Sequence, residues 1–417
     1  MPEASLPSIG DLHDDQIVAL LRSGAHAALL IAYFGELEYR ELSQLAKLAA
    51  TRRNPRGRRV FVLPGIMGSR LGLVTRRSYS LIWLHPTAVA NGSLLQLAIP
   101  GSRALRAVGV MLPGYLKLRL RLEIAGFRPV FCPFDWRRDV DQLARAFART
   151  IERSGERKAL VVGHSMGGLV ARAALAYDKR RIARLIQLGA PNDGSFAPVQ
   201  ALRAVYPTVR KIAALDRNHT AEHLARTVYH TLPGLYQMLP SALSAADCDL
   251  FDQRSWPGDE LAPDPKLLAR ARKVRARLPA ASERCCVIAG VGQETIVSVA
   301  LRDNGFHYEY RAEGDGTVPL SRARWNDAAT WFVKENHGAL TQNDSVLAAV
   351  ADILKTGDTR RLRTTAPRTN QVAARIVTDA ELRASALRKV QWETLSLDSR
   401  RRILEPVISP EFLASNV

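Results

Sequence analysis

The feature that most restricts the fold of this chain is a short turn between a buried strand and a helix. Residues 159–163 (ALVVG) are apolar and rich in valine, as in a strand buried on both faces. GHSMG (163–167) follows directly, and MGGLVARAALAY (166–177) has a helical pattern. A G-x-S-x-G pattern is common by chance, but between a strand and a helix it indicates a sharp turn. The turn holds the hydroxyl of Ser165 above the strand end.

This strand–turn–helix unit is the nucleophile elbow of an α/β-hydrolase. Strand patterns also occur at 59–63, 128–132, 182–191, 285–292, 295–301, 306–311 and 330–335. Helical patterns occur at 113–127, 139–155 and 345–355. Strands that alternate with helices predict a mostly parallel sheet covered by helices on both faces.

The same patterns divide the chain into four parts. We expect a helical N-terminal extension (1–55), an α/β-hydrolase domain (56–355), a polar, basic linker (356–371) and a helical C-terminal tail (372–417). Residues 195–283 are helix-rich and too long for an ordinary connection, so they predict a cap inserted into the domain. Within the tail, TDAE (378–381) predicts a capping box that begins a short helix.

A serine hydroxyl is a weak nucleophile at neutral pH, so it needs a base, and the base needs an orienting acid. In this fold the acid follows the serine and the histidine comes last. His337 lies between the last predicted strand and the last helix of the domain, where the fold places its base. The other histidines after Ser165 lie in the cap (His219, His223, His230) or in a strand pattern (His307). Asp315, in a Gly-Asp-Gly turn, is the favoured acid, and Asp193 is its competitor.

Near the start of the domain, FVLPGIMGSRLG (61–72) is an apolar strand that ends in a bare glycine loop. The oxyanion of an acyl-transfer intermediate needs about two N–H donors. One is the amide of the residue after the nucleophile, Met166, and the other comes from this early loop. We expect Ile66 to supply the second donor. Apolar residues of the cap are expected to contact the acyl group: Phe196, Tyr206, Leu235, Tyr236 and Met238.

Seven segments resemble, in order, the lecithin:cholesterol acyltransferase family with its phospholipase relatives. They are VFVLPGIMGSRL, SLIWLHP, FDWRRD, GHSMGG, GAPNDGS, GDGTVP and NHG. The resemblance spans roughly 58–340 and implies an α/β-hydrolase with Ser165, Asp315 and His337 as catalytic triad. It places the oxyanion hole at the amides of Ile66 and Met166. It implies hydrolysis of a lipid or other ester, or acyl transfer to an alcohol, through an acyl-enzyme; the sequence does not separate the two.

Composition bounds the other possibilities. The formal net charge is +19, but the basic residues are scattered rather than clustered with aromatic residues, so no specific nucleic-acid partner is expected. Four cysteines form no metal-binding spacing, and the triad chemistry needs no metal or organic cofactor. The first residues show no signal-peptide pattern, which predicts a cytoplasmic protein, with peripheral membrane contact as an option.

One alternative from another class stays open. A catalytically silent hydrolase fold could act as a binding or scaffold protein through its basic surface and helical extensions. The presence of Ser165, Asp315 and His337 together argues against it, because a relic would usually have lost one of them. The sequence leaves the acyl donor and the oligomeric state open.

Overall fold

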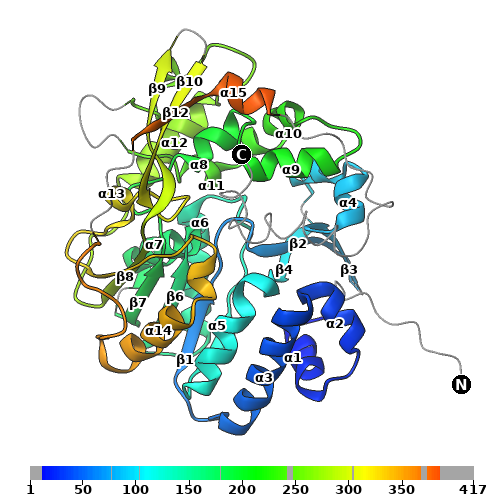
Figure 1. Cartoon of the computed structure of the whole chain (residues 1–417), viewed down its shortest axis with the longest axis vertical. Helices are drawn as coiled ribbons and strands as arrows, with labels where there is room; N and C mark the ends of the chain where they lie inside the picture. Colours follow the sequence, from blue (N-terminus) through cyan, green and yellow to red (C-terminus); the bar gives the residue numbers. More distant parts are fainter. Residues whose placement is uncertain are drawn as a thin grey trace, which may run out of the picture.

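The centre of the protein is a six-stranded sheet with the strand order β11-β8-β7-β6-β1-β5. Figure 1 labels four of its strands, β1, β6, β7 and β8. The computed structural model describes residues 12–385 except 77, 103, 179, 242–247, 303–304 and 368–372. All neighbouring strands of the sheet are parallel. They are β1 (Arg59–Leu63), β5 (Arg128–Phe131), β6 (Ala159–His164), β7 (Ile182–Leu188), β8 (Cys285–Gly290) and β11 (Ala329–Val333).

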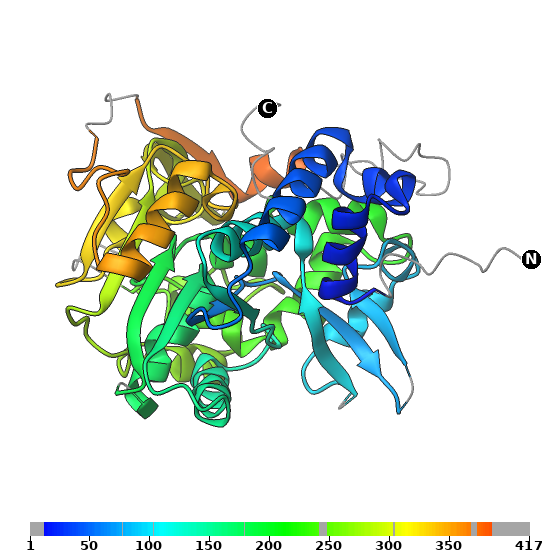
Figure 2. The same cartoon turned by 90° about the horizontal axis from the view of Figure 1, so that it is seen from below.

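Both faces of the sheet are covered because its strands are apolar on both sides. In β1, Val60 and Val62 belong to one hydrophobic core, and Phe61 and Leu63 belong to another. The first core includes α5 (Leu112–Ile124) and α14 (Asp344–Thr356), and the second includes α6 (Val140–Arg153) and α7 (Met166–Asp178). The two pairs of helices lie on opposite sides of the sheet (Figure 2). This arrangement confirms the predicted α/β-hydrolase fold.

The strands predicted at 295–301 and 306–311 are present, but they lie outside the central sheet. These residues fall in β9 (Gln293–Arg302) and β10 (Gly305–Gly314), which pair antiparallel outside the central sheet. Only two residues separate the strands, which is too short for the crossover that parallel strands need. The turn-forming sequence Asp-Asn-Gly at 303–305 is the signal that reveals a hairpin.

A second antiparallel sheet follows the loop after β1. It contains β2 (Ser69–Val74), β3 (Tyr79–Trp83) and β4 (Leu105–Val110), in the order β3-β2-β4. α4 (Pro86–Ala90) lies between β3 and β4 in the chain. The glycine loop therefore joins the central sheet at one end and this small sheet at the other.

The N-terminal segment forms three helices that pack against α5 (Figure 1). They are α1 (Asp14–Ser23), α2 (Ala27–Phe34) and α3 (Glu36–Arg52). Leu21, Phe34 and Leu42 share one hydrophobic core with Leu116 and Leu120 of α5. Within the described residues no single helix is long and apolar enough to span a membrane. α1 and α2 reach that length and composition only when taken together, and the pair is bent by 119°.

The segment between β7 and β8 contains the helices expected of a cap. They are α8 (Ala197–Leu202), α9 (Pro207–Leu215), α10 (Ala221–Thr227), α11 (Pro233–Tyr236) and α12 (Pro265–Arg275). A further short helix, α13 (Leu320–Ala323), lies after β10.

The C-terminal segment is not wholly helical as predicted. Residues Arg375–Thr378 form β12, which pairs with β10, because Ile376, Val377 and Thr378 are β-branched and meet an available strand edge. The predicted capping box is confirmed: Thr378 and Glu381 cap α15 (Asp379–Ala384) reciprocally. The rest of the predicted tail, from 386, lies outside the described residues.

A buried ion pair fastens this segment to the cap. Asp379 is fully buried; it accepts hydrogen bonds from Arg203 Nε (2.9 Å) and the hydroxyl of Tyr308 (2.7 Å). Arg203, at the end of α8, is also buried and pairs with Asp259 through both terminal nitrogens (2.6 and 2.7 Å). One arginine therefore holds two carboxylates from distant parts of the chain.

We predict that Asp379→Asn destabilises the protein by roughly 3 kcal/mol, the low end for breaking a buried pair, because Asp259 still pairs with Arg203. Urea unfolding measures the change. Asp352→Asn is the matched control: its pair with Arg361 (2.8 Å) is exposed and should contribute less than about 1 kcal/mol. If both variants lose the same free energy of unfolding, the buried pair stabilises the protein no more than the exposed pair does.

Candidate active site

The predicted elbow has a strained backbone at its serine. Ser165 adopts a left-handed conformation (φ 52°), and its N–H donates to the carbonyl of Leu188 on the neighbouring strand (2.9 Å). Glycines make the turn possible. A Cβ at Gly167 would lie 2.3 Å from the carbonyl oxygen of Pro64, and one at Gly163 would lie 2.8 Å from Gly167. The helix α7 can therefore start in direct contact with the end of β1.

The structure brings the predicted base and acid together. His337 follows β11 and Asp315 follows β10, and His337 Nδ1 lies 2.7 Å from Asp315 Oδ2. A carboxylate only accepts, so Nδ1 carries the proton of this bond; in the neutral imidazole the lone pair is then on Nε2. The other carboxylate oxygen, Oδ1, accepts from the N–H groups of Thr317 (3.0 Å) and Val318 (2.7 Å). Three donors thus fix one buried carboxylate against the imidazole.

Asp193 lies elsewhere. It is in the loop after β7, its carboxylate is 4.0 Å from Arg275, and its main chain bonds to Arg322 and Ser241. Among the cap histidines, His230 bonds to the carbonyl of Leu202 on α8. This geometry favours Asp315 over Asp193 as the partner of His337.

Ser165 and His337 both line a cavity of about 110 Å³. The loop after β1 contributes Gly65 and Ile66, and the cap contributes small side chains from α8, such as Ala197 and Ala201. Of the apolar cap residues predicted to contact an acyl group, three line this cavity: Tyr206, Leu235 and Met238.

The other two predicted cap residues do not line the cavity. The Tyr236 hydroxyl donates to the carbonyl of His230 (3.1 Å) and accepts from the N–H of Asp264 (3.0 Å). Phe196 packs under the guanidinium of Arg322 at 5.1 Å. Both side chains are buried inside the cap, so their sequence pattern reflects packing.

The predicted oxyanion donors lie next to Ser165. A Cβ at Gly65 would lie only 3.0 Å from the Cβ of Ser165, so the loop passes close to the serine. In the part of the chain that the structure describes, the N–H groups of Ile66 and Met166 donate to no other protein group. Both amides are therefore free to bind an oxyanion.

The sequence did not single out two further polar residues of the site. Tyr115 Oη lies 2.7 Å from the N–H of Gly65 and 2.8 Å from His164 Nδ1. His164 Nε2 lies 3.0 Å from the carbonyl oxygen of His337. Burial and the adjacent His337 lower the pKa of His164 from 6.5 to about 3. Tyr115 sits at a core position of a predicted helix, and only the rule that a buried tyrosine hydroxyl needs a partner could have identified it.

The described residues contain no group of three or more His, Cys, Asp or Glu side chains placed to hold a metal ion. None of the four cysteines forms a disulfide in the part of the chain that the structure describes. Burial raises the pKa of Cys132 to about 12 and that of Cys286 to about 11, so neither thiol is readily ionised.

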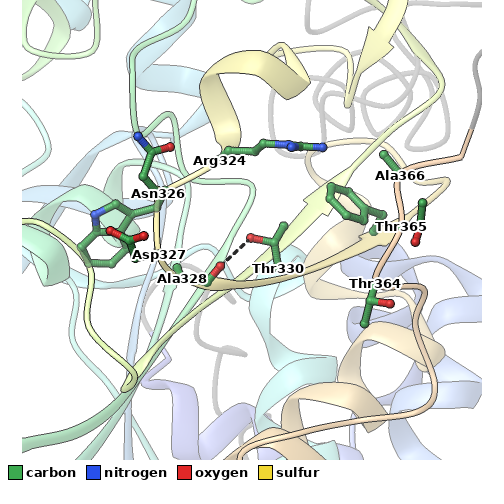
Figure 3. A pocket seen from close by; sticks show the side chains of 10 residues that line it. Arg324, Asn326, Asp327, Ala328, Thr330, Thr364, Thr365 and Ala366 are labelled. Atoms are coloured by element: carbon green, nitrogen blue, oxygen red, sulfur yellow. Dashed lines mark hydrogen bonds between the residues drawn. The ribbon is translucent and has the colours of Figure 1, made fainter.

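A second, polar cavity of about 480 Å³ shares no residue with the cavity at Ser165. Its lining includes Arg324, Asn326, Thr330, Thr364 and Thr365 (Figure 3). Thr330 Oγ1 donates to the carbonyl of Ala328, as Figure 3 shows. No group arranged for acyl chemistry occurs among these residues.

Comparison with known proteins agrees with the fold. The family model PGAP1-like alpha/beta domain matches residues 141–245, from α6 through the elbow into the cap. A search of curated proteins found no match.

Several solved structures are similar. Lipase BlEst2 of Bacillus licheniformis, in its propeptide form, is 15% identical over 77% of this chain and 53% of that one (TM-score 0.40). This chain thus spans about half of that protein. The Tle4–Tli4 complex is 14% identical over 72% of this chain and 98% of that one (TM-score 0.42). Carboxylesterase CesB of Bacillus subtilis is 11% identical over 74% of this chain and 87% of that one (TM-score 0.34). These TM-scores are too low to carry an argument; the strand order and the elbow support the fold by themselves.

The lowered pKa of His164 predicts a pH-dependent stability. Between pH 6.5 and 3 the unfolded chain binds a proton that the folded chain excludes, so stability falls as the pH falls through this window, by up to about 1.4 kcal/mol per pH unit. In His164→Phe this contribution is absent. We expect wild type to lose roughly 3 kcal/mol more than the variant between pH 7 and 4.5.

Urea unfolding at the two pH values measures this difference. Tyr115 and His337, the titratable groups in contact with His164, are present in both proteins, so the comparison isolates His164. A difference in stability that is the same at both pH values would show that His164 binds a proton as readily in the folded state as in the unfolded state.

Proposed function

We propose that this protein is a serine-dependent acyl-ester hydrolase that works through an acyl-enzyme intermediate. The observation that carries the proposal is the buried His337–Asp315 pair beside the strained Ser165, at one shared cavity. The resemblance to the lecithin:cholesterol acyltransferase family supports an ester of the lipid class or a related ester as substrate, and acyl transfer as the variant reaction.

In the first half-reaction, Ser165 Oγ attacks the ester carbonyl carbon while His337 Nε2 takes the hydroxyl proton. Asp315 holds the Nδ1–H of the imidazole and stabilises the imidazolium that forms. The oxyanion accepts from the amides of Ile66 and Met166; losing one such donor costs about 10²–10³ in kcat. The intermediate collapses, and His337 gives its proton to the departing alcohol.

In the second half-reaction, a water molecule attacks the acyl carbon and His337 Nε2 takes its proton. Collapse of the new intermediate releases the carboxylic acid and returns the proton to Ser165. An alcohol in place of water would accept the acyl group instead. The two outcomes use the same groups and differ only in which acceptor reaches the acyl-enzyme.

The cavity size favours short acyl groups. An apolar cavity of about 150 Å³ holds one benzene ring, and this cavity of about 110 Å³ is smaller. Leu235 and Met238 of the cap are among its lining residues. We therefore propose acyl chains of a few carbons as the preferred substrates.

Substitutions in the proposed triad test the mechanism. Ser165→Ala and His337→Ala should each lower kcat by roughly 10⁴–10⁶-fold, because triad members act as a unit. Asp315→Asn should cost on the order of 10⁴, because an amide no longer holds the productive tautomer. Kinetics on one soluble ester measure these effects.

Asp193→Asn is the matched control, with an expected loss of tenfold or less. An inactive Asp193→Asn with an active Asp315→Asn would reverse the assignment of the acid. Failure of wild type to react with a fluorophosphonate at Ser165, or to cleave any ester, would favour the silent scaffold instead.

Chain-length kinetics test the proposed substrate size. We expect kcat/KM for the p-nitrophenyl octanoate ester to be at least about tenfold below that for the butyrate, because each badly placed methylene can cost tenfold or more. Leu235→Ala should enlarge the cavity and so reduce the preference for butyrate over octanoate. Leu239→Ala, a buried leucine of the same segment outside the lining, should leave the ratio unchanged. A wild type that prefers octanoate refutes the size argument.

A further inference from the structure

A directed chain of hydrogen bonds runs beneath the proposed nucleophile. A carbonyl oxygen only accepts, so His164 Nε2 must donate to His337 O (3.0 Å). A neutral imidazole has one N–H, so His164 Nδ1 accepts from the Tyr115 hydroxyl (2.8 Å). The tyrosine oxygen in turn accepts from the N–H of Gly65 (2.7 Å). The main-chain carbonyl at one end and the main-chain N–H at the other therefore fix the direction of every hydrogen bond between them.

The two ends of this chain belong to different parts of the proposed machinery. Gly65 immediately precedes Ile66, the proposed oxyanion donor, and His337 is the proposed base. The middle member, His164, immediately precedes Ser165. The chain therefore links the oxyanion loop, the nucleophile turn and the base loop through side chains that are themselves buried.

The surroundings leave little room for these groups to shift. A Cβ at Gly68 would lie 2.8 Å from Tyr115 Oη, and a Cβ at Gly65 would lie 3.3 Å from His164 Nδ1. The loop after β1 is therefore wrapped around the tyrosine hydroxyl. The rings of His164 and His337 also pack together, with centroids 4.9 Å apart.

We propose that Tyr115 and His164 are positioning residues that hold the Ile66 amide and the His337 ring in register with Ser165. The inference rests on the proposed function. His164 does not serve as a base itself, because both of its nitrogens are engaged inside the protein. Its neutral state supplies one donor and one acceptor, which the chain requires and an imidazolium could not provide.

Tyr115→Phe removes only the hydroxyl and separates positioning from packing. Because a shift of about 1 Å can cost 10²-fold, we expect kcat to fall roughly 10- to 100-fold with KM within about threefold of wild type. The acid limb of the kcat/KM pH profile should keep its position, because the substitution leaves the His337–Asp315 pair in place.

Tyr236→Phe is the matched control. That tyrosine is also buried and also makes one donated and one accepted hydrogen bond, but away from the cavity at Ser165. We expect it to lose stability and keep kcat. Equal kcat in the two Phe variants would overturn the positioning role of Tyr115.

Three substitutions of His164 test each half of the chain. Asn can place an acceptor near the former Nδ1, Gln can place a donor near the former Nε2, and Phe supplies neither. We expect His164→Phe to lose the most kcat, and His164→Asn and His164→Gln each to recover part of it. Equal losses in all three variants, or a Phe variant that is the most active, would overturn the proposal.

Histidine ¹⁵N NMR tests the chain of hydrogen bonds independently of any activity measurement. His164 should give the neutral Nε2–H tautomer from pH 8 to 5, and its signals should change in Tyr115→Phe. A different tautomer of His164 would refute the proposed chain of hydrogen bonds. The expected tautomer in a protein that neither cleaves esters nor reacts with a fluorophosphonate overturns the proposed function instead.

Discussion

The site depends on one close backbone contact, where the start of α7 rests on the carbonyl groups that end β1. A side chain at Gly167 would lie 2.3 Å from Pro64 O and 2.5 Å from Leu63 O, so only glycine fits. This contact brings two chain segments about a hundred residues apart to the same side of Ser165. It places the Met166 amide, which begins the helix, beside the loop that carries Ile66. Strand pairing between β1 and β6 alone would align the strands but leave the distance between these two amides undetermined.

Much of the fold was predictable because its signals are local. Largely apolar runs of five to ten residues predicted the strands of the central sheet, and their alternation with helices predicted that the sheet is parallel. The strands β9 and β10 were predicted, and the turn sequence between them is a local signal for their hairpin. The strand β12 was missed, within a tail predicted as helical, because its pairing is not local. The run 375–378 has β-branched residues, but only the edge of β10, some 65 residues earlier, makes it a strand.

The residues of the candidate site likewise fall into those that local sequence patterns identify and those that they do not. Ser165, Asp315 and His337 were identifiable because the fold places such residues in loops after strands, in a fixed chain order. Tyr206 and Tyr236 have similar sequence surroundings in the cap, yet one lines the cavity and the other packs inside. Tyr115 looks like an ordinary core residue of α5. Such differences arise from tertiary contacts, which the sequence pattern does not contain.

The hydrogen bond between His164 and the main chain of His337 joins residues 173 positions apart. During synthesis from the N-terminus, β1, β5, β6 and β7 exist well before His337 does. Contacts between such distant residues are slow to form. The central strands can therefore pair while Ser165 still lacks its partners. Reactivity of that serine would thus mark the end of folding rather than formation of the sheet, and a chemical probe of the serine would distinguish finished molecules from compact but incomplete ones.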